Sequence, residues 1–238
     1  MKEPIFRSTG LGDVTNHLSE FIDFSLNVSI DERHPRGIYA LAIIACTSKL
    51  ESIFEETLVN WCESKPDNQS YNQRVLDKIR KDISRSTGLE KWKEWIKIIF
   101  DIELPNILVD EWESLKKLFQ LRNQIAHGRT TKFRQYYKQD GKFIGMEMEE
   151  SGYREIFKFL LKENIISVPE GSIPTVNSIL SKQVVEHFSN IVEAALEQLS
   201  GHSGFEAIKY YQKSSQPYRV TSDFSSSEDF DLIREVDY

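Results

Sequence analysis

Apolar residues recur at steps of three and four along most of the chain, a spacing that places them on one face of an α-helix. This periodicity predicts helices over residues 13–30, 37–62, 70–84, 90–101, 107–127, 152–163 and 181–200. No internal repeat or long heptad array is present. The sequence therefore predicts an all-α fold.

One segment breaks the helical pattern. Residues 132–149, KFRQYYKQDGKFIGMEME, contain a central Asp140-Gly141 pair, which favours the tight turn of a β-hairpin. Ile144, Met146 and Met148 then alternate with other residues, as they do in a strand. We expect a small β-hairpin insertion at 131–150 within one helical domain that covers residues 1–200.

The C-terminal part of the chain has a different composition. Beyond Gly201 the apolar periodicity is lost, and the stretch SSQPYRVTSDFSSSED is typical of a flexible linker. Residues 223–238 carry a net charge of −5. We expect residues 201–238 to be a linker followed by an acidic tail.

Hydrophobic residues make up 39% of the 238-residue chain, which is enough for a buried core. The N-terminus, MKEPIFRSTG, lacks the apolar region of a secretory signal, and the longest apolar run, residues 38–46, is too short to span a bilayer. We expect a soluble, cytoplasmic protein with no membrane partner. Cys46 and Cys62 are too few for a disulfide framework or a zinc site, and they fit reduced core thiols.

Positive charge is concentrated in one segment of an acidic chain. The formal net charge of −7 argues against general affinity for nucleic acids, but residues 116–138 carry +7 with no Asp or Glu. Tyrosines among these cations suit phosphate contact and base stacking, although an ordinary solvated face is the alternative. The candidate RNA-binding residues are Lys116, Lys117, Arg129, Lys132, Arg134, Tyr136, Tyr137 and Lys138.

An arginine interrupts the apolar stripe of the helix predicted at 107–127. The stripe runs through Leu108, Trp112, Leu115, Phe119, Arg122 and Ala126. Burying the guanidinium of Arg122 is costly unless a carboxylate, a phosphate or water receives its donors. Glu51 borders the apolar face of the helix predicted at 37–62, so we expect it to pair with Arg122 unless it reaches water instead.

The same helix ends in a polar cluster. His127 followed by Gly128 is a C-terminal signature in which the glycine adopts the left-handed conformation. Asn123 and His127 are four residues apart and share a face, and Arg122 is long enough to reach across. Alternatively, these residues only fasten the helix end. The other histidines show no metal-ligand spacing and no nucleotide-binding loop is present, so we expect no metal and no cofactor.

The segment RNQIAHG at 122–128 resembles the Arg-Asn-x-x-x-His signature of the HEPN superfamily (higher eukaryotes and prokaryotes nucleotide-binding domains). The helix predicted at 37–62, which carries SKLESIFEETL, is similar to the partner of the motif helix in that family. The resemblance covers residues 11–200, and only 122–128 is specific. It implies an antiparallel helical bundle in which Arg122, Asn123 and His127 are catalytic and Glu51 supports them.

Many HEPN proteins are metal-independent endoribonucleases of toxin–antitoxin and antiphage systems, and others are non-catalytic modules that bind nucleotides, RNA or proteins. The resemblance therefore implies RNA cleavage by the 2′-hydroxyl of the substrate, with the non-catalytic module as the alternative. In such a reaction His127 manages protons and Arg122 stabilises the phosphorane. Because one histidine is half of an acid–base pair, we expect a homodimer with a composite active site. An antitoxin or regulatory protein is a further expected partner.

Overall fold

The computed structural model of the chain describes residues 11–27, 35–63, 73–128, 133–148, 152–168, 176–202, 204–205 and 208. These residues are predominantly helical, as the apolar periodicity predicts. The helices are α1 (Leu11–Asn27), α2 (Pro35–Glu63), α3 (Gln73–Ile83), α4 (Leu89–Phe100), α5 (Leu104–Ile107), α6 (Trp112–Ala126), α7 (Gly152–Lys162), α8 (Val176–Ile179) and α9 (Lys182–Ser200). The strands are β1 (Phe133–Tyr137) and β2 (Phe143–Met148).

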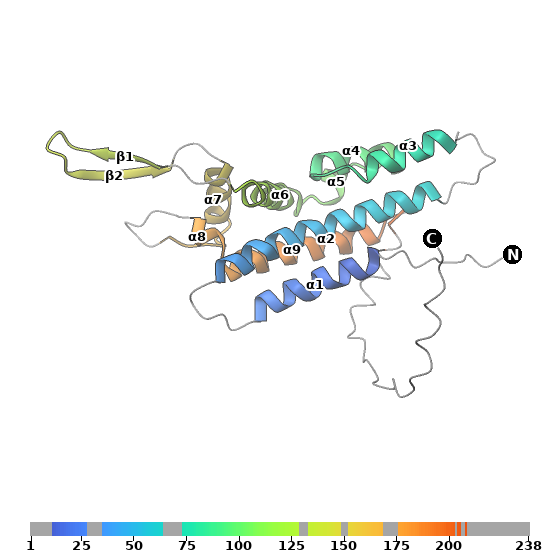
Figure 1. Cartoon of the computed structure of the whole chain (residues 1–238), viewed down its shortest axis with the longest axis horizontal. Helices are drawn as coiled ribbons and strands as arrows, with labels where there is room; N and C mark the ends of the chain where they lie inside the picture. Colours follow the sequence, from blue (N-terminus) through green and yellow to red (C-terminus); the bar gives the residue numbers. More distant parts are fainter. Residues whose placement is uncertain are drawn as a thin grey trace, which may run out of the picture.

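Helix α2 is the centre of the helical body. It contacts α1, α3, α4, α6 and α9, and Figure 1 shows α2 and α9 side by side with α1 next to them. Because neighbours cover α2 on several sides, its buried residues do not form a single stripe. Those exposed by 1% or less are Ala42, Ile43, Cys46, Thr47, Leu50, Ile53, Phe54 and Leu58. A polar residue in the middle of α2, such as Glu51, therefore lies among packed helices.

The central position of α2 also explains its strongly apolar composition. The segment Arg36–Glu63 is long and apolar enough to cross a membrane by length and composition alone, but half of its most apolar window is buried in the body, as in the core helix of a soluble protein. Cys46 and Cys62 are free and buried, as predicted. Burial raises the pKa of the Cys46 thiol to about 12, so this side chain remains protonated.

The helix predicted at 107–127 begins later than expected, at Trp112, the first residue of α6. Helix α5 ends at Ile107, and Leu108 departs from the helical conformation with φ −94° and ψ 49° before α6 begins. The amide of Trp112 still donates to the carbonyl oxygen of Leu108 at 2.8 Å, which keeps the apolar spacing in phase across the break. The apolar spacing therefore placed the start of the predicted helix before the residue at which α6 begins.

Strands β1 and β2 form a two-stranded antiparallel arm (residues 133–148) that projects from the helical body, as Figure 1 shows. Phe133 pairs with Met148 at the base of the arm. The predicted Asp140-Gly141 pair lies at the tip, within a connection that covers residues 138–142 and is longer than a two-residue turn. Gly141 has a φ of 79°, and the amide of Lys142 donates to Oδ1 of Asp140 at 2.9 Å.

The chain returns from the arm to the body at Gly152, the first residue of α7. A Cβ atom at Gly152 would lie 2.2 Å from Nε2 of Gln124, a buried residue of α6, so any larger residue would force Gln124 to move. The side-chain amide of Gln120 also donates to the carbonyl oxygen of Gly152 at 3.3 Å. Helix α7 therefore begins against the C-terminal half of α6, close to the point where the chain leaves for the arm.

The core extends past the boundary predicted at residue 200. Phe205 is fully buried, and its ring centroid lies 6.5 Å from that of Phe54 and 5.5 Å from that of Phe100. Ile208 is also buried. Phe205 and Ile208 are isolated apolar residues that do not continue the helical spacing of α9. The prediction therefore assigned them to the linker at 201–238. The acidic tail predicted at 223–238 lies outside the described residues.

His187 in α9 should make the stability of the fold sensitive to acid. Its ring packs against Phe159 and Phe188, and its Nε2 atom is buried with no hydrogen-bond partner among the described residues. Burial lowers the pKa of His187, and the negative charge of Glu163 opposes this shift only in part. The folded state therefore keeps His187 neutral, while the unfolded chain binds a proton as the pH falls through about 6.5.

We expect the contribution of His187 to stability to be complete above the unfolded-state pKa and to be lost as the pH falls toward the lower folded-state pKa. The melting temperature of the parent should therefore fall between about pH 7 and about pH 5, and His187→Gln should show a smaller fall. Thermal melts across this range provide the measurement. Equal falls for both proteins would contradict the assignment.

Candidate functional site

Arg122 lies at the edge of the buried face of α6. Leu115, Leu118 and Leu121 are fully buried, the side chain of Arg122 is 20% exposed, and Ala126 is exposed. The predicted apolar stripe therefore ends at Arg122 and does not reach Ala126. In the last turn of α6 a different face is packed, because Gln124 is buried next to Gly152 of α7. The long side chain of Arg122 spans the edge of the buried face.

Glu51 of α2 and Arg122 form the ion pair that the sequence predicts. Nη2 of Arg122 donates to Oε2 of Glu51 at 2.6 Å, and the Glu51 side chain is 15% exposed. Each charge satisfies the other at a position where an unpaired charge would be costly. Burial first, and then the negative charge of Glu51, raise the pKa of Glu55, one turn further along α2. The site thus contains the carboxylate of Glu51, which is paired, and that of Glu55, which binds a proton more easily than usual.

Two donors from the start of α4 also bind Glu51. The amide of Gly88 donates to Oε1 at 2.8 Å, and Nε1 of Trp92 donates to the same oxygen at 3.3 Å. Glu51 therefore connects α2, α4 and α6 at one point. Sequence reasoning missed Gly88 and Trp92. The only signal that Trp92 carries is its place in the apolar pattern of α4, which predicts a core residue and no hydrogen bond to a carboxylate.

Asn123 extends the ion pair toward the surface. Nη1 of Arg122 donates to Oδ1 of Asn123 at 2.9 Å, and the guanidinium carbon lies 6.0 Å from the ring centroid of Phe119. A guanidinium has five N–H groups, and those of Arg122 that Glu51 and Asn123 do not use have no hydrogen-bond partner within the described part of the chain. Arg122 is therefore held in place and retains donors for an anionic group such as a phosphate.

His127 is the C-terminal cap of α6. Its amide donates to the carbonyl oxygen of Asn123 at 3.2 Å, and Gly128 follows with a φ of 57°, the left-handed glycine that the sequence predicts. The imidazole is exposed and forms no hydrogen bond or ion pair with any residue that the structure describes. The structure therefore joins the side chains of Glu51, Arg122 and Asn123 by direct contacts. The His127 imidazole lies one turn further along α6 and makes no hydrogen bond to these three side chains.

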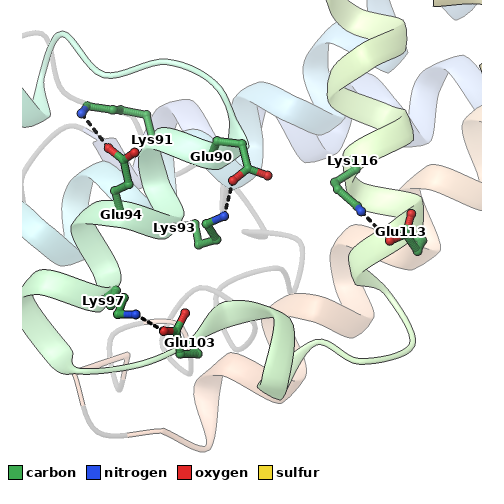
Figure 2. A network of polar contacts seen from close by, with 8 residues as sticks. All are labelled: Glu90, Lys91, Lys93, Glu94, Lys97, Glu103, Glu113 and Lys116. Carbon is green, nitrogen blue, oxygen red and sulfur yellow. Dashed lines mark hydrogen bonds and ion pairs between the residues drawn. The ribbon is translucent and has the colours of Figure 1, made fainter.

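Two of the candidate RNA-binding lysines lie in α6 and have partners there. Lys116 forms an ion pair with Glu113, as Figure 2 shows, and Nζ of Lys117 donates to Oε1 of Gln120 at 3.2 Å. The positive charge counted over residues 116–138 leaves out Glu113, which lies one helical turn before Lys116. The charge that this part of α6 offers to a phosphate is therefore smaller than the sequence count indicates.

The arm carries the remaining candidates that the structure describes. Four of the candidate RNA-binding side chains are exposed on the arm: Arg134, Tyr136, Tyr137 and Lys138. The hydroxyl of Tyr137 donates to Oε1 of Gln135 at 2.6 Å. Cations and aromatic rings on a projecting surface suit contact with phosphates and bases. Two further candidates lie between α6 and β1, outside the described residues: Arg129 and Lys132.

The described residues contain no group of three or more His, Cys, Asp and Glu side chains that could hold a metal ion. Comparisons with protein-family models, curated proteins and solved structures found no match. The chemistry of the polar cluster at the end of α6 therefore carries the functional argument.

Proposed function

We propose that the chain is a metal-independent endoribonuclease of the HEPN type, with the antiparallel helical bundle of that family. The arrangement at the end of α6 supports this proposal, because Glu51 holds Arg122 beside Asn123 and leaves His127 exposed one turn away. A fixed guanidinium and an accessible imidazole are the groups that RNA cleavage by its own 2′-hydroxyl requires.

In the proposed reaction a bond forms between the 2′-oxygen and phosphorus, and the bond from phosphorus to the 5′-oxygen breaks. His127 accepts the proton of the 2′-hydroxyl or donates one to the leaving 5′-oxygen. Arg122 donates to the non-bridging oxygens of the phosphorane, and Asn123 holds a phosphate oxygen or orients the imidazole. The products carry a 2′,3′-cyclic phosphate and a 5′-hydroxyl.

The proposed enzyme is a homodimer. One histidine supplies half of an acid–base pair, and a two-fold axis that brings two copies of α6 together supplies the other half. The exposed cations and tyrosines of the arm are the proposed RNA contacts. On the family resemblance alone, we assign the enzyme to the cytoplasm and to a toxin–antitoxin or antiphage system, with an antitoxin or regulatory protein as its partner.

A non-catalytic HEPN-like module that binds nucleotides, RNA or proteins is the second candidate. The contacts of Arg122 favour it, since Glu51 and Asn123 already give the guanidinium partners within the chain. In that case Arg122 serves the fold, and its replacement reduces stability without the loss of a chemical activity. Loss of RNA cleavage in a folded Arg122 variant distinguishes the enzyme from the module.

The proposed chemistry predicts the ends of the RNA products. Cleavage in excess EDTA should proceed at the rate seen without the chelator, because no step of the scheme uses a metal ion. Mass spectrometry of the fragments should find a 2′,3′-cyclic phosphate or the 3′-phosphate formed by its hydrolysis. Strict magnesium dependence or 3′-hydroxyl ends would contradict this mechanism. Binding of RNA without cleavage would favour the non-catalytic module.

A further inference from the structure

Glu51 uses its two carboxylate oxygens for different contacts. Oε2 accepts a hydrogen bond from Arg122 at 2.6 Å, while Oε1 accepts one from the Gly88 amide at 2.8 Å and one from Trp92 Nε1 at 3.3 Å. The terminal torsion of a glutamate has a broad energy minimum, so a carboxylate needs external contacts to define its plane. Because the group is planar, donors that fix Oε1 also fix the position of Oε2.

The two donors to Oε1 are themselves held firmly. The Gly88 amide belongs to the backbone at the start of α4, where the Gly88 carbonyl oxygen accepts from the amides of Lys91 and Trp92 at 3.1 Å and 3.3 Å. Trp92 is 1% exposed, and its ring centroid lies 6.2 Å from that of Phe54 in the core. A ring packed in this way cannot turn without displacing its neighbours, so the direction of its N–H bond is fixed.

We infer that Trp92 is a positioning residue for Arg122. Its indole N–H acts together with the Gly88 amide to orient Glu51, and Glu51 in turn holds the guanidinium of Arg122 at the edge of the body. The catalytic consequence of this inference rests on the proposed function. The positioning itself is a property of the folded chain and is measurable without RNA.

Helix α4 provides a matched control for Trp92. Nε1 of Trp95, three residues further along, donates to Oγ of Ser86 at 2.9 Å, and this bond does not involve Glu51. Trp92→Phe and Trp95→Phe each remove one indole donor from α4 and retain an aromatic ring. Only the first variant should change the environment of Arg122.

The first test is nuclear magnetic resonance of protein labelled with ¹⁵N-arginine, in which Arg122→Lys assigns the Arg122 side-chain signals. The parent should show separate Nη signals for Arg122, because its contacts slow rotation of the guanidinium. Trp92→Phe should average these signals, and Trp95→Phe should leave them unchanged. If Trp92→Phe does not fold, 3-benzothienylalanine at this position keeps the shape of the indole without its N–H. Unchanged Arg122 signals in the folded Trp92 variant, or equal changes in both variants, would overturn the inference.

Cleavage kinetics give a second readout. Trp92→Phe should lower kcat about tenfold with KM changed by less than about twofold, because the lost hydrogen bond positions a group that acts on the phosphorane. Trp95→Phe should retain the parent kcat. An equal loss of kcat in both variants would also overturn the inference. If the parent cuts no RNA, the proposed function fails, and the Arg122 resonances alone decide whether Trp92 positions the guanidinium.

Discussion

His127→Ala should abolish RNA cleavage and leave the melting temperature at the parent value. Removing a side chain that transfers protons lowers the rate of a reaction by about 10²–10⁴-fold. The fold should lose little, because the imidazole is exposed and contacts no described side chain, and a residue at a helix end typically contributes about 1 kcal/mol. A fluorescent RNA substrate measures cleavage, and circular dichroism measures melting.

His202→Ala is the matched control for this variant. His202 is a second exposed histidine just beyond the end of a helix, since it follows Gly201, the C-cap of α9. Its variant should cut RNA at the parent rate. If His127→Ala cuts RNA as well as the parent does, His127 has no part in the chemistry. A marked fall in its melting temperature would instead indicate that the imidazole serves the fold.

Arg122→Ala should reduce cleavage far more than stability. Cleavage should fall by about 10²–10³-fold, the loss typical when a donor to a developing negative charge is removed. Breaking a fully buried ion pair costs about 3–5 kcal/mol. Here Glu51 keeps two other donors and both side chains are partly exposed, so we expect a loss of about 2 kcal/mol in the free energy of unfolding. Arg122→Lys should not restore full activity, because an ammonium lacks the planar fork.

Denaturant titrations of the Glu51→Gln/Arg122→Ala double mutant separate the two roles of Arg122. Loss of the Glu51 charge should recover part of the stability but none of the activity. Arg80→Ala is the control for removing an arginine from an ion pair that does not involve Glu51, because Arg80 pairs with Glu63 at 3.8 Å on a more exposed surface. If folded Arg122→Ala still cuts RNA at the parent rate, or if stability loss alone accounts for its inactivity, Arg122 is a structural residue and the non-catalytic module is favoured.

The long helices could be predicted because each repeats its apolar residues over several turns. Helices α2 and α9 lie within two residues of the ranges 37–62 and 181–200 at both ends. Helices α5 and α8 have four residues each, which is too short to show a period. The start of α6 was predicted too early because Leu108 and Trp112 share one helical spacing. Phe205 was missed because it fills a core gap outside any periodic segment.

The ion pair of Glu51 and Arg122 could be predicted because a charge in an apolar stripe requires a partner. The contacts of Gly88 and Trp92 could not, since a backbone amide and an indole N–H leave no pattern in the sequence. Their placement depends on how α4 crosses α2, which is a property of the tertiary packing. The partners of Lys116 and Lys117 each lie three residues away in α6, so helical spacing could have predicted both contacts.

Gly152 has a consequence for how chains of this architecture can vary. Because α7 begins against Gln124, the insertion leaves and rejoins the body at neighbouring points, and no described side chain of the arm belongs to the core. An insertion attached in this way can be lengthened, shortened or exchanged without altering how Glu51 reaches Arg122. If the arm contacts RNA as we propose, target preference can diverge in the arm while the helical scaffold is retained.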